Sequence, residues 1–130
     1  MAADRLISSG GPWEAVIGYS RAVVAGEYVH VSGSTATVDG VLQHEGDAYS
    51  QTLTAFKVIE SALAQAGYSL ADIVRTRVYV SDASHMDHVA KAHGELFGEI
   101  RPAATMLAGI SFINPNMLVE IEVDAWKRQA

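Results

Sequence analysis

A chain of 130 residues with a formal net charge of −6 and 49% hydrophobic residues is expected to form one domain spanning residues 1–130. Its lack of cysteine excludes disulfides, thiolate nucleophiles and cysteine-based metal sites. The acidic charge argues against nucleic-acid binding, and no apolar run approaches the roughly 18 residues that a membrane-spanning helix requires.

The first third of the chain predicts short strands joined by tight turns. Residues 3–9 fit an edge strand, which a Gly-Gly-Pro loop follows. Residues 20–33 predict a hairpin, because two β-branched stretches flank the turn Ala25-Gly26-Glu27. A second tight turn is predicted at Asp39-Gly40, a pair that favours two-residue hairpin loops.

Residues 47–66 carry the strongest helical pattern in the sequence. Asp47 is suited to cap the N-terminus of this helix, and Gly67 suits the left-handed conformation that follows a helix end. Apolar residues at steps of three and four define a stripe, and a row of alanines beside the stripe permits close packing on a sheet. The stripe consists of Tyr49, Leu53, Phe56, Ile59, Leu63 and Ala66, and the row consists of Ala48, Ala55 and Ala62.

The second half predicts a strand over residues 73–80, a helix over 84–97 and two final strands over 103–110 and 118–126. The element order indicates an α+β fold, in which two helices pack on one face of a largely antiparallel sheet. The alternation in the first of these strands places Val74, Thr76, Val78 and Val80 on one face and Ile73, Arg75, Arg77 and Tyr79 on the other.

Three acidic residues share one face of the last strand: Glu120, Glu122 and Asp124. One interpretation is a solvated face, in which these acids pair across strands with Arg75 and Arg77. The alternative is a carboxylate in a partly apolar cleft, where a raised pKa lets it move a proton for an attacking water. The spacing alone does not choose between Glu120 and Glu122.

Three hydroxyl side chains are candidates for a binding site, and each also has an ordinary structural interpretation. Tyr19 can pack on its neighbours and give its hydroxyl to a backbone carbonyl or water. Ser32 can bond locally to the backbone, and Thr105 is a typical β-branched strand residue.

The five histidines do not predict a metal site. His85 and His88 share a helix face, but no acidic third ligand stands at a defined spacing from them. His93 belongs to the apolar stripe of its helix and is interpreted as a core histidine. Phosphate-binding loops and dinucleotide-binding glycine motifs are missing from the sequence, so we expect neither a metal nor a cofactor.

Four segments carry a resemblance to a known family: residues 18–23, 29–33, 101–106 and 118–125. They are similar to the Rid family of small imine deaminases, which is also called the YjgF or L-PSP family. The resemblance extends over nearly the whole chain and implies the chorismate-mutase-like α+β fold. It also implies a homotrimer with clefts between subunits, which would account for the apolar composition of so short a chain.

In this family, an arginine binds the carboxylate of a 2-imino acid while a glutamate positions the water that attacks the C=N carbon. The resemblance assigns the glutamate to Glu120 and places Tyr19 and Ser32 in the substrate pocket. The arginine position falls on Ala104, and the neighbouring pocket positions are Thr105 and Met106.

Ala104 has no charge with which to bind a carboxylate, so we expect a neutral or bulkier substrate than a 2-imino acid. Arg101 is three residues away, and in an extended strand it would point to the opposite face. It is therefore not expected to replace the missing arginine.

We therefore expect a hydrolase or deaminase that acts on an imine or enamine-type small metabolite, with Glu120 as the catalytic acid and base. The alternative is a non-catalytic trimer that binds a small ligand, and an endoribonuclease fits the acidic charge least. The N-terminus shows no signal-peptide pattern, so a cytoplasmic location is expected.

Overall fold

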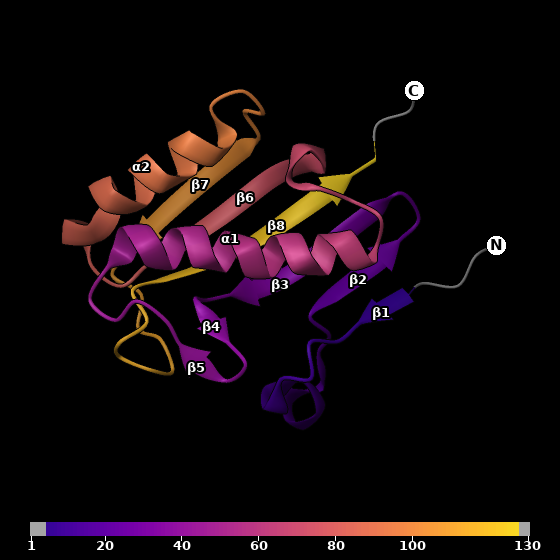
Figure 1. Cartoon of the computed structure of the whole chain (residues 1–130), viewed down its shortest axis with the longest axis horizontal. Coiled ribbons are helices and arrows are strands. Elements are labelled where there is room, and N and C mark those ends of the chain that lie inside the picture. The colour runs from indigo at the N-terminus through magenta and orange to yellow at the C-terminus, as the bar shows by residue number, and fades with distance from the viewer. Residues whose placement is uncertain (1–4, 128–130) are drawn as a thin grey trace.

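Six strands form the main sheet of the protein, and two helices cover one of its faces (Figure 1). The structure is a computed structural model that describes residues 5–127. The strands of the sheet are β1 (Arg5–Ile7), β2 (Ala22–Ala25), β3 (Tyr28–Ser34), β6 (Ile73–Val80), β7 (Ala103–Ala108) and β8 (Val119–Trp126). Their order is β1-β2-β3-β8-β6-β7, and every neighbouring pair is antiparallel except β6–β7. The predicted α+β fold is confirmed.

The two helices are α1 (Ala48–Gln65) and α2 (Met86–Phe97), and they pack against each other as well as on the sheet. Within residues 5–127, neither they nor any shorter helix has the length and hydrophobicity that a membrane crossing needs. The remaining elements are a π-helical turn η1 (Glu14–Gly18), the 3-10 turns η2 (Leu70–Asp72) and η3 (Ala83–His85), and a separate hairpin of β4 (Thr37–Val38) and β5 (Val41–Leu42).

The elements that depend on local signals form where the sequence predicts them. The Asp47 carboxylate accepts a hydrogen bond from the backbone N–H of Ser50 at 3.0 Å, and Gly67 follows α1 with a φ of 80°. Asp39 and Gly40 join β4 to β5 with φ values of 51° and 79°, as the predicted two-residue turn requires. The strand predicted over residues 3–9 is observed at Arg5–Ile7, and residues 3 and 4 lie outside the described part of the chain.

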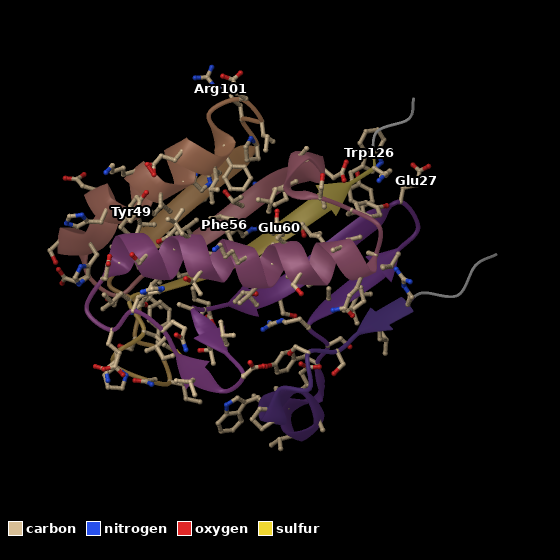
Figure 2. All side chains as sticks on the ribbon, in the orientation of Figure 1. Glu27, Tyr49, Phe56, Glu60, Arg101 and Trp126 are labelled. Atoms are coloured by element: carbon tan, nitrogen blue, oxygen red, sulfur yellow. The ribbon has the colours of Figure 1, made fainter. Side chains whose placement is uncertain are left out.

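Helix α1 buries the predicted alanine row and half of its predicted apolar stripe, namely Phe56, Ile59 and Leu63, but not the stripe's first two residues. The alanine row is buried together with Gln51 and Thr52, whereas Tyr49 and Leu53 are only partly buried. Tyr49 reaches toward α2 instead, where its hydroxyl donates a hydrogen bond to Glu95 (Figure 2). The buried face of α1 therefore combines the large Phe56, Ile59 and Leu63 with the small alanines beside them.

Strand β6 departs once from its predicted alternation. From Thr76 onward its residues alternate as expected, but Ile73 is buried as well, although the pattern placed it on the opposite face. The pairing with β8 shifts register between Ile73 and Arg75, so Val74 has no partner on β8. Such a bulge reverses the side-chain alternation, which explains why Ile73 faces the core.

The histidine predicted to belong to the core from α2 is partly buried and lies against core residues. His93 Nε2 lies 2.9 Å from the Thr76 hydroxyl, and its ring contacts those of Phe56 and Phe97. Burial lowers the pKa of His93, as expected for an imidazole that stays neutral inside the fold.

Candidate functional site

Two of the three acidic side chains on β8 are held by neighbouring residues. They lie on the face of the sheet opposite the helices, here called the outer face. The Glu122 carboxylate accepts a hydrogen bond from the Tyr79 hydroxyl. Asp124 lies 2.7 Å from His30 Nδ1 and 3.2 Å from Arg77 Nη1. The predicted pairing with arginine is therefore observed for Asp124 with Arg77, whereas Glu122 is held by a tyrosine and no ion pair with Arg75 forms among the described residues.

Glu120 differs from both because its carboxylate has no hydrogen bond to any residue within 5–127. Burial raises the pKa of Glu120 above its usual range, the positive charge of Arg21 opposes this effect, and the negative charge of Glu122 adds to it. An unpaired carboxyl group with a raised pKa is suited to accept and return a proton near neutral pH. Glu120 and Glu122, which spacing could not tell apart, therefore differ in their hydrogen bonds.

The position of the Glu120 side chain depends on an irregularity in β3. The pairing of β3 with β8 shifts register between Val31 and Ser34, and Gly33 lies within this shift. The Glu120 side chain lies over Gly33, where a Cβ atom would be 3.0 Å from the Glu120 carboxyl carbon and 3.2 Å from its Cγ. Glycine is therefore the residue that leaves room for Glu120 in this conformation.

A cavity of about 760 Å³ opens beside Glu120. Its walls come from η1 with the loop before it, from the β4–β5 hairpin and from the loop over residues 113–117, all of which lie outside the main sheet. The hairpin and the indigo helical turn lie at the same side of the molecule, below α1 in Figure 1. Trp13, Tyr19, Leu42, Ile113 and Met117 supply the larger apolar surfaces of the cavity.

One wall of the cavity is shaped by a buried acid that the sequence reasoning missed. Glu14 is only 8% exposed, and its carboxylate accepts hydrogen bonds from the Ser9 hydroxyl at 2.6 Å and from the backbone N–H of Ser9 and Gly11. Burial acts to raise the pKa of Glu14, but hydrogen bonds from Ser9, Ser8 and Gly11 outweigh it and lower the pKa. No motif in the sequence predicts this loop, because the hydrogen bonds of Glu14 to Ser9 and Gly11 depend on how η1 packs against the preceding residues.

Arg21 is the second residue that the sequence reasoning missed. It lines the cavity, its Nη2 donates a hydrogen bond to the Gly33 carbonyl at 2.6 Å, and its guanidinium carbon lies 5.9 Å from the centroid of the Tyr19 ring. Its Nε is buried and has no hydrogen-bond partner within residues 5–127. The sequence does contain a signal, namely a lone cation two residues after Tyr19 and immediately before β2.

Only two of the predicted pocket residues, Tyr19 and Glu120, line the cavity. Ser32 is adjacent to Gly33 but does not line the cavity, and its hydroxyl donates a hydrogen bond to the Ser20 carbonyl at 2.6 Å. The other three belong to β7, which β6 separates from β8, and they do not line the cavity within one chain. These three are Ala104, Thr105 and Met106.

The β7 residues point to both sides of the sheet. Thr105 is opposite Arg77, a residue of the outer face, whereas Met106 packs partly against the core. Arg101 precedes β7 in a loop with a φ of 56°, so the chain is not extended there as the sequence argument assumed. Figure 2 shows Arg101 on the side of the molecule away from η1 and the β4–β5 hairpin.

Comparison with known proteins identifies the relatives of this chain. The family described as "Endoribonuclease L-PSP" matches residues 12–127. An uncharacterized protein of Streptomyces coelicolor is 42% identical over 125 residues, which cover 96% of this chain and 93% of that protein. The 3-aminoacrylate deaminase RutC of Acinetobacter baylyi is 30% identical over 104 residues, covering 79% and 82% of the two chains.

A solved structure gives the same result at the level of the fold. Rv2704 of Mycobacterium tuberculosis, a member of the YjgF/YER057c/UK114 family, is 44% identical to this chain. The two structures superpose with a TM-score of 0.86, and the match covers 96% of this chain and 100% of the other. Together with the family match, these similarities show that the chain belongs to the Rid family, also called the YjgF or L-PSP family.

Proposed function

We propose that this protein is a hydrolase that releases ammonia from an imine or enamine-type small metabolite, with Glu120 as its catalytic acid and base. The observation that carries this proposal is the state of Glu120, which lines a cavity without a hydrogen-bond partner among residues 5–127. Burial raises its pKa, which favours proton exchange with a substrate at neutral pH. The name of the Acinetobacter relative, an aminoacrylate deaminase, describes a reaction of this class.

The reaction can be written with one proton carrier. The Glu120 carboxylate takes a proton from water as the water oxygen bonds to the carbon of a protonated imine, which gives a neutral carbinolamine. Glu120 then returns that proton to the nitrogen. The C–N bond breaks, and the departing nitrogen leaves with the hydroxyl proton as ammonium, so an iminium ion and water become a carbonyl compound and ammonium. An enamine enters the same sequence once its β-carbon has been protonated.

We place the complete site in a cleft between subunits of a homotrimer. On this view Ala104, Thr105 and Met106 of β7 contribute from a neighbouring chain to the cavity that contains Glu120. Support comes from the exposure of Ala104 and Thr105 and from the apolar Leu107, which is 49% exposed on the same edge strand. A trimer in the cytoplasm also fits the apolar composition and the lack of cysteine.

Ala104 distinguishes this protein from the 2-imino acid deaminases of the Rid family, which have an arginine at this position. An alanine on β7 offers no charge to a substrate carboxylate, so a 2-imino acid would not be bound there as it is in those enzymes. Turnover of 2-iminopropionate would therefore require a group on another wall of the cavity to bind its carboxylate.

The test compares Glu120→Gln with Glu122→Gln, a matched change two residues along the same strand. Imines generated in the assay by an amino-acid oxidase are offered in the presence of excess semicarbazide, and ammonia release and semicarbazone are both measured. Wild type and Glu122→Gln should spare the imine from the trap, whereas Glu120→Gln should lose at least about 100-fold in rate.

Other outcomes would reject catalysis by Glu120. Equal activity in wild type and Glu120→Gln would show that another group carries the proton. Ligand binding without turnover of any imine or enamine would favour a non-catalytic binding protein. RNA cleavage that follows the wild-type protein through purification and falls in Glu120→Gln would favour the endoribonuclease.

A further inference from the structure

Arg21 is the one cationic side chain among the described residues that line the cavity beside Glu120. It shares the cavity with three carboxyl groups, those of Glu14, Asp39 and Glu120. Glu14 is already occupied by hydrogen bonds from Ser9 and Gly11. The cavity therefore combines one positive group with acidic surroundings, and the charges of a ligand must complement both.

The guanidinium of Arg21 is incompletely paired. Its single hydrogen bond within residues 5–127 goes from Nη2 to the Gly33 carbonyl, and its Nε is buried without a partner. No ion pair joins Arg21 to an acid of the described chain, although the charge of Arg21 acts on the Glu120 carboxyl group. Its Nη1 has no hydrogen bond among the described residues either and, unlike Nε, is not enclosed by protein, so it can donate to an acceptor on a ligand.

The surroundings of Arg21 leave room for such an acceptor. Arg21 also lines an adjoining hollow of about 390 Å³, between α1 and the β4–β5 hairpin, so its side chain borders open space on two sides. Its contact with the Tyr19 ring and its bond to Gly33 fix the guanidinium in place. A fixed, planar group with free N–H donors matches the two oxygens of a carboxylate.

We propose that Arg21 binds the carboxylate of the substrate, and that it supplies, from its position just before β2, the positive charge that Ala104 lacks on β7. This inference rests on the proposed function in one respect, which is that the cavity beside Glu120 is the substrate site. Because the carboxylate is bound at a different wall, the substrate lies in a different orientation from the one that an arginine at residue 104 would impose.

The acidic surroundings narrow the substrate class further. Glu120 and Asp39 disfavour a second negative charge in the cavity but favour a cationic group opposite Arg21. A protonated imine or enamine that carries one carboxylate has this distribution of charge. Dianions such as phosphate monoesters do not have it, and they are expected to bind poorly.

The test measures binding of two small ligands of nearly the same shape, 2-oxobutanoate and its uncharged amide 2-oxobutanamide, by calorimetry or NMR titration. Wild type should prefer the carboxylate. Arg21→Gln should lose about 10- to 100-fold in affinity for 2-oxobutanoate while its affinity for 2-oxobutanamide changes by less than about threefold. Arg21→Lys, which keeps the charge but not the planar fork, should retain part of the preference. Lys91→Gln on the exposed surface of α2 is the control for net charge.

Three results would overturn the role of Arg21. In the first, Arg21→Gln loses affinity equally for both ligands. In the second, wild type binds the two ligands with equal affinity, and in the third it binds neither. Thermal unfolding of Arg21→Lys checks that the fold survives the change of side chain.

The same titration in Glu120→Gln separates this inference from the proposed reaction. If wild type hydrolyses no imine but Glu120→Gln still prefers the carboxylate ligand, the hydrolase is rejected and Arg21 is kept as the binding residue. If Arg21→Gln releases ammonia at the wild-type rate at low substrate concentration, the hydrolase is kept and the role of Arg21 is rejected.

Discussion

The Glu120 side chain lies over Gly33 so closely that a Cβ atom on Gly33 would be 3.0 Å from the Glu120 carboxyl carbon. Gly33 has no left-handed backbone conformation, so an alanine there meets no backbone strain. The atoms that would have to move belong to the flexible end of one side chain.

Gly33→Ala is therefore expected to fold normally and to lose activity. Displacing the Glu120 carboxyl group by a few tenths of an ångström to one ångström should cost up to about 100-fold in kcat. The measurement is imine hydrolysis beside the midpoint of urea unfolding. A variant with wild-type kcat would show that the observed position of Glu120 is not the reactive one.

Glu122→Gln should move the acidic limb of the pH–activity profile to lower pH. Burial is the main reason that the pKa of Glu120 is raised, Arg21 opposes it, and the charge of Glu122 raises it further. Removing that charge leaves burial and Arg21 in place and lowers the Glu120 pKa, so its carboxylate form persists in more acidic solution. The profile of kcat/KM from pH 4 to 8 tests this, and a shift in the alkaline direction would contradict it.

Glu120→Gln should make the folded protein more stable at neutral pH. Because the folded-state pKa of Glu120 lies above its ordinary value of 4.5, the wild type loses stability as the pH rises from that value through the folded pKa. Glutamine does not titrate, so the stability gain of the variant should appear above this window and vanish below it. Urea unfolding at pH 4 and pH 8, at one protein concentration, measures the difference. A gain of equal size at both values would point to packing instead of charge.

Gln51→Leu should destabilise the protein by about 2–4 kcal/mol. The buried Gln51 side chain donates to the carbonyls of His44 and Asn116, at 3.1 Å each, and accepts from the Leu118 N–H at 2.9 Å. Leucine fills the space but leaves three backbone groups without these partners. Chemical unfolding measures the loss, with Gln65→Leu at the exposed end of α1 as the control. Equal stability of the two variants would mean that water replaces the lost bonds.

The parts of the fold that local signals specify could be predicted from the sequence. The cap at Asp47, the left-handed Gly67 and the turn at Asp39-Gly40 act within a few residues, and all three formed as expected. The bulge at Val74 and the burial of Gln51 and Thr52 in α1 could not be predicted, because they depend on which strand or helix lies opposite.

Some residues of the candidate site could likewise be predicted from the sequence, and others could not. Tyr19 and Glu120 were found through short matching segments, and they do share a cavity. The roles of Gly33 and Arg21 depend on the register shift in β3, which brings the carbonyl of Gly33 to Arg21 and its α-carbon to Glu120. No periodicity or spacing in one sequence records a contact of this kind.

Strand β8 lies in the middle of the sheet, between β3 and β6, and the Glu120 carboxyl group is anchored there. Apart from Arg21, Gly33 and Val58, most of the surfaces that a ligand would meet belong to η1 with the loop before it, the β4–β5 hairpin and the 113–117 loop, which pack around the sheet without being part of it. Substitutions or insertions in these segments disturb few core contacts. The proton-transfer group and the groups that select the molecule can therefore evolve separately, so a descendant of this chain could exchange one substrate for another while its stability and its reaction stay the same.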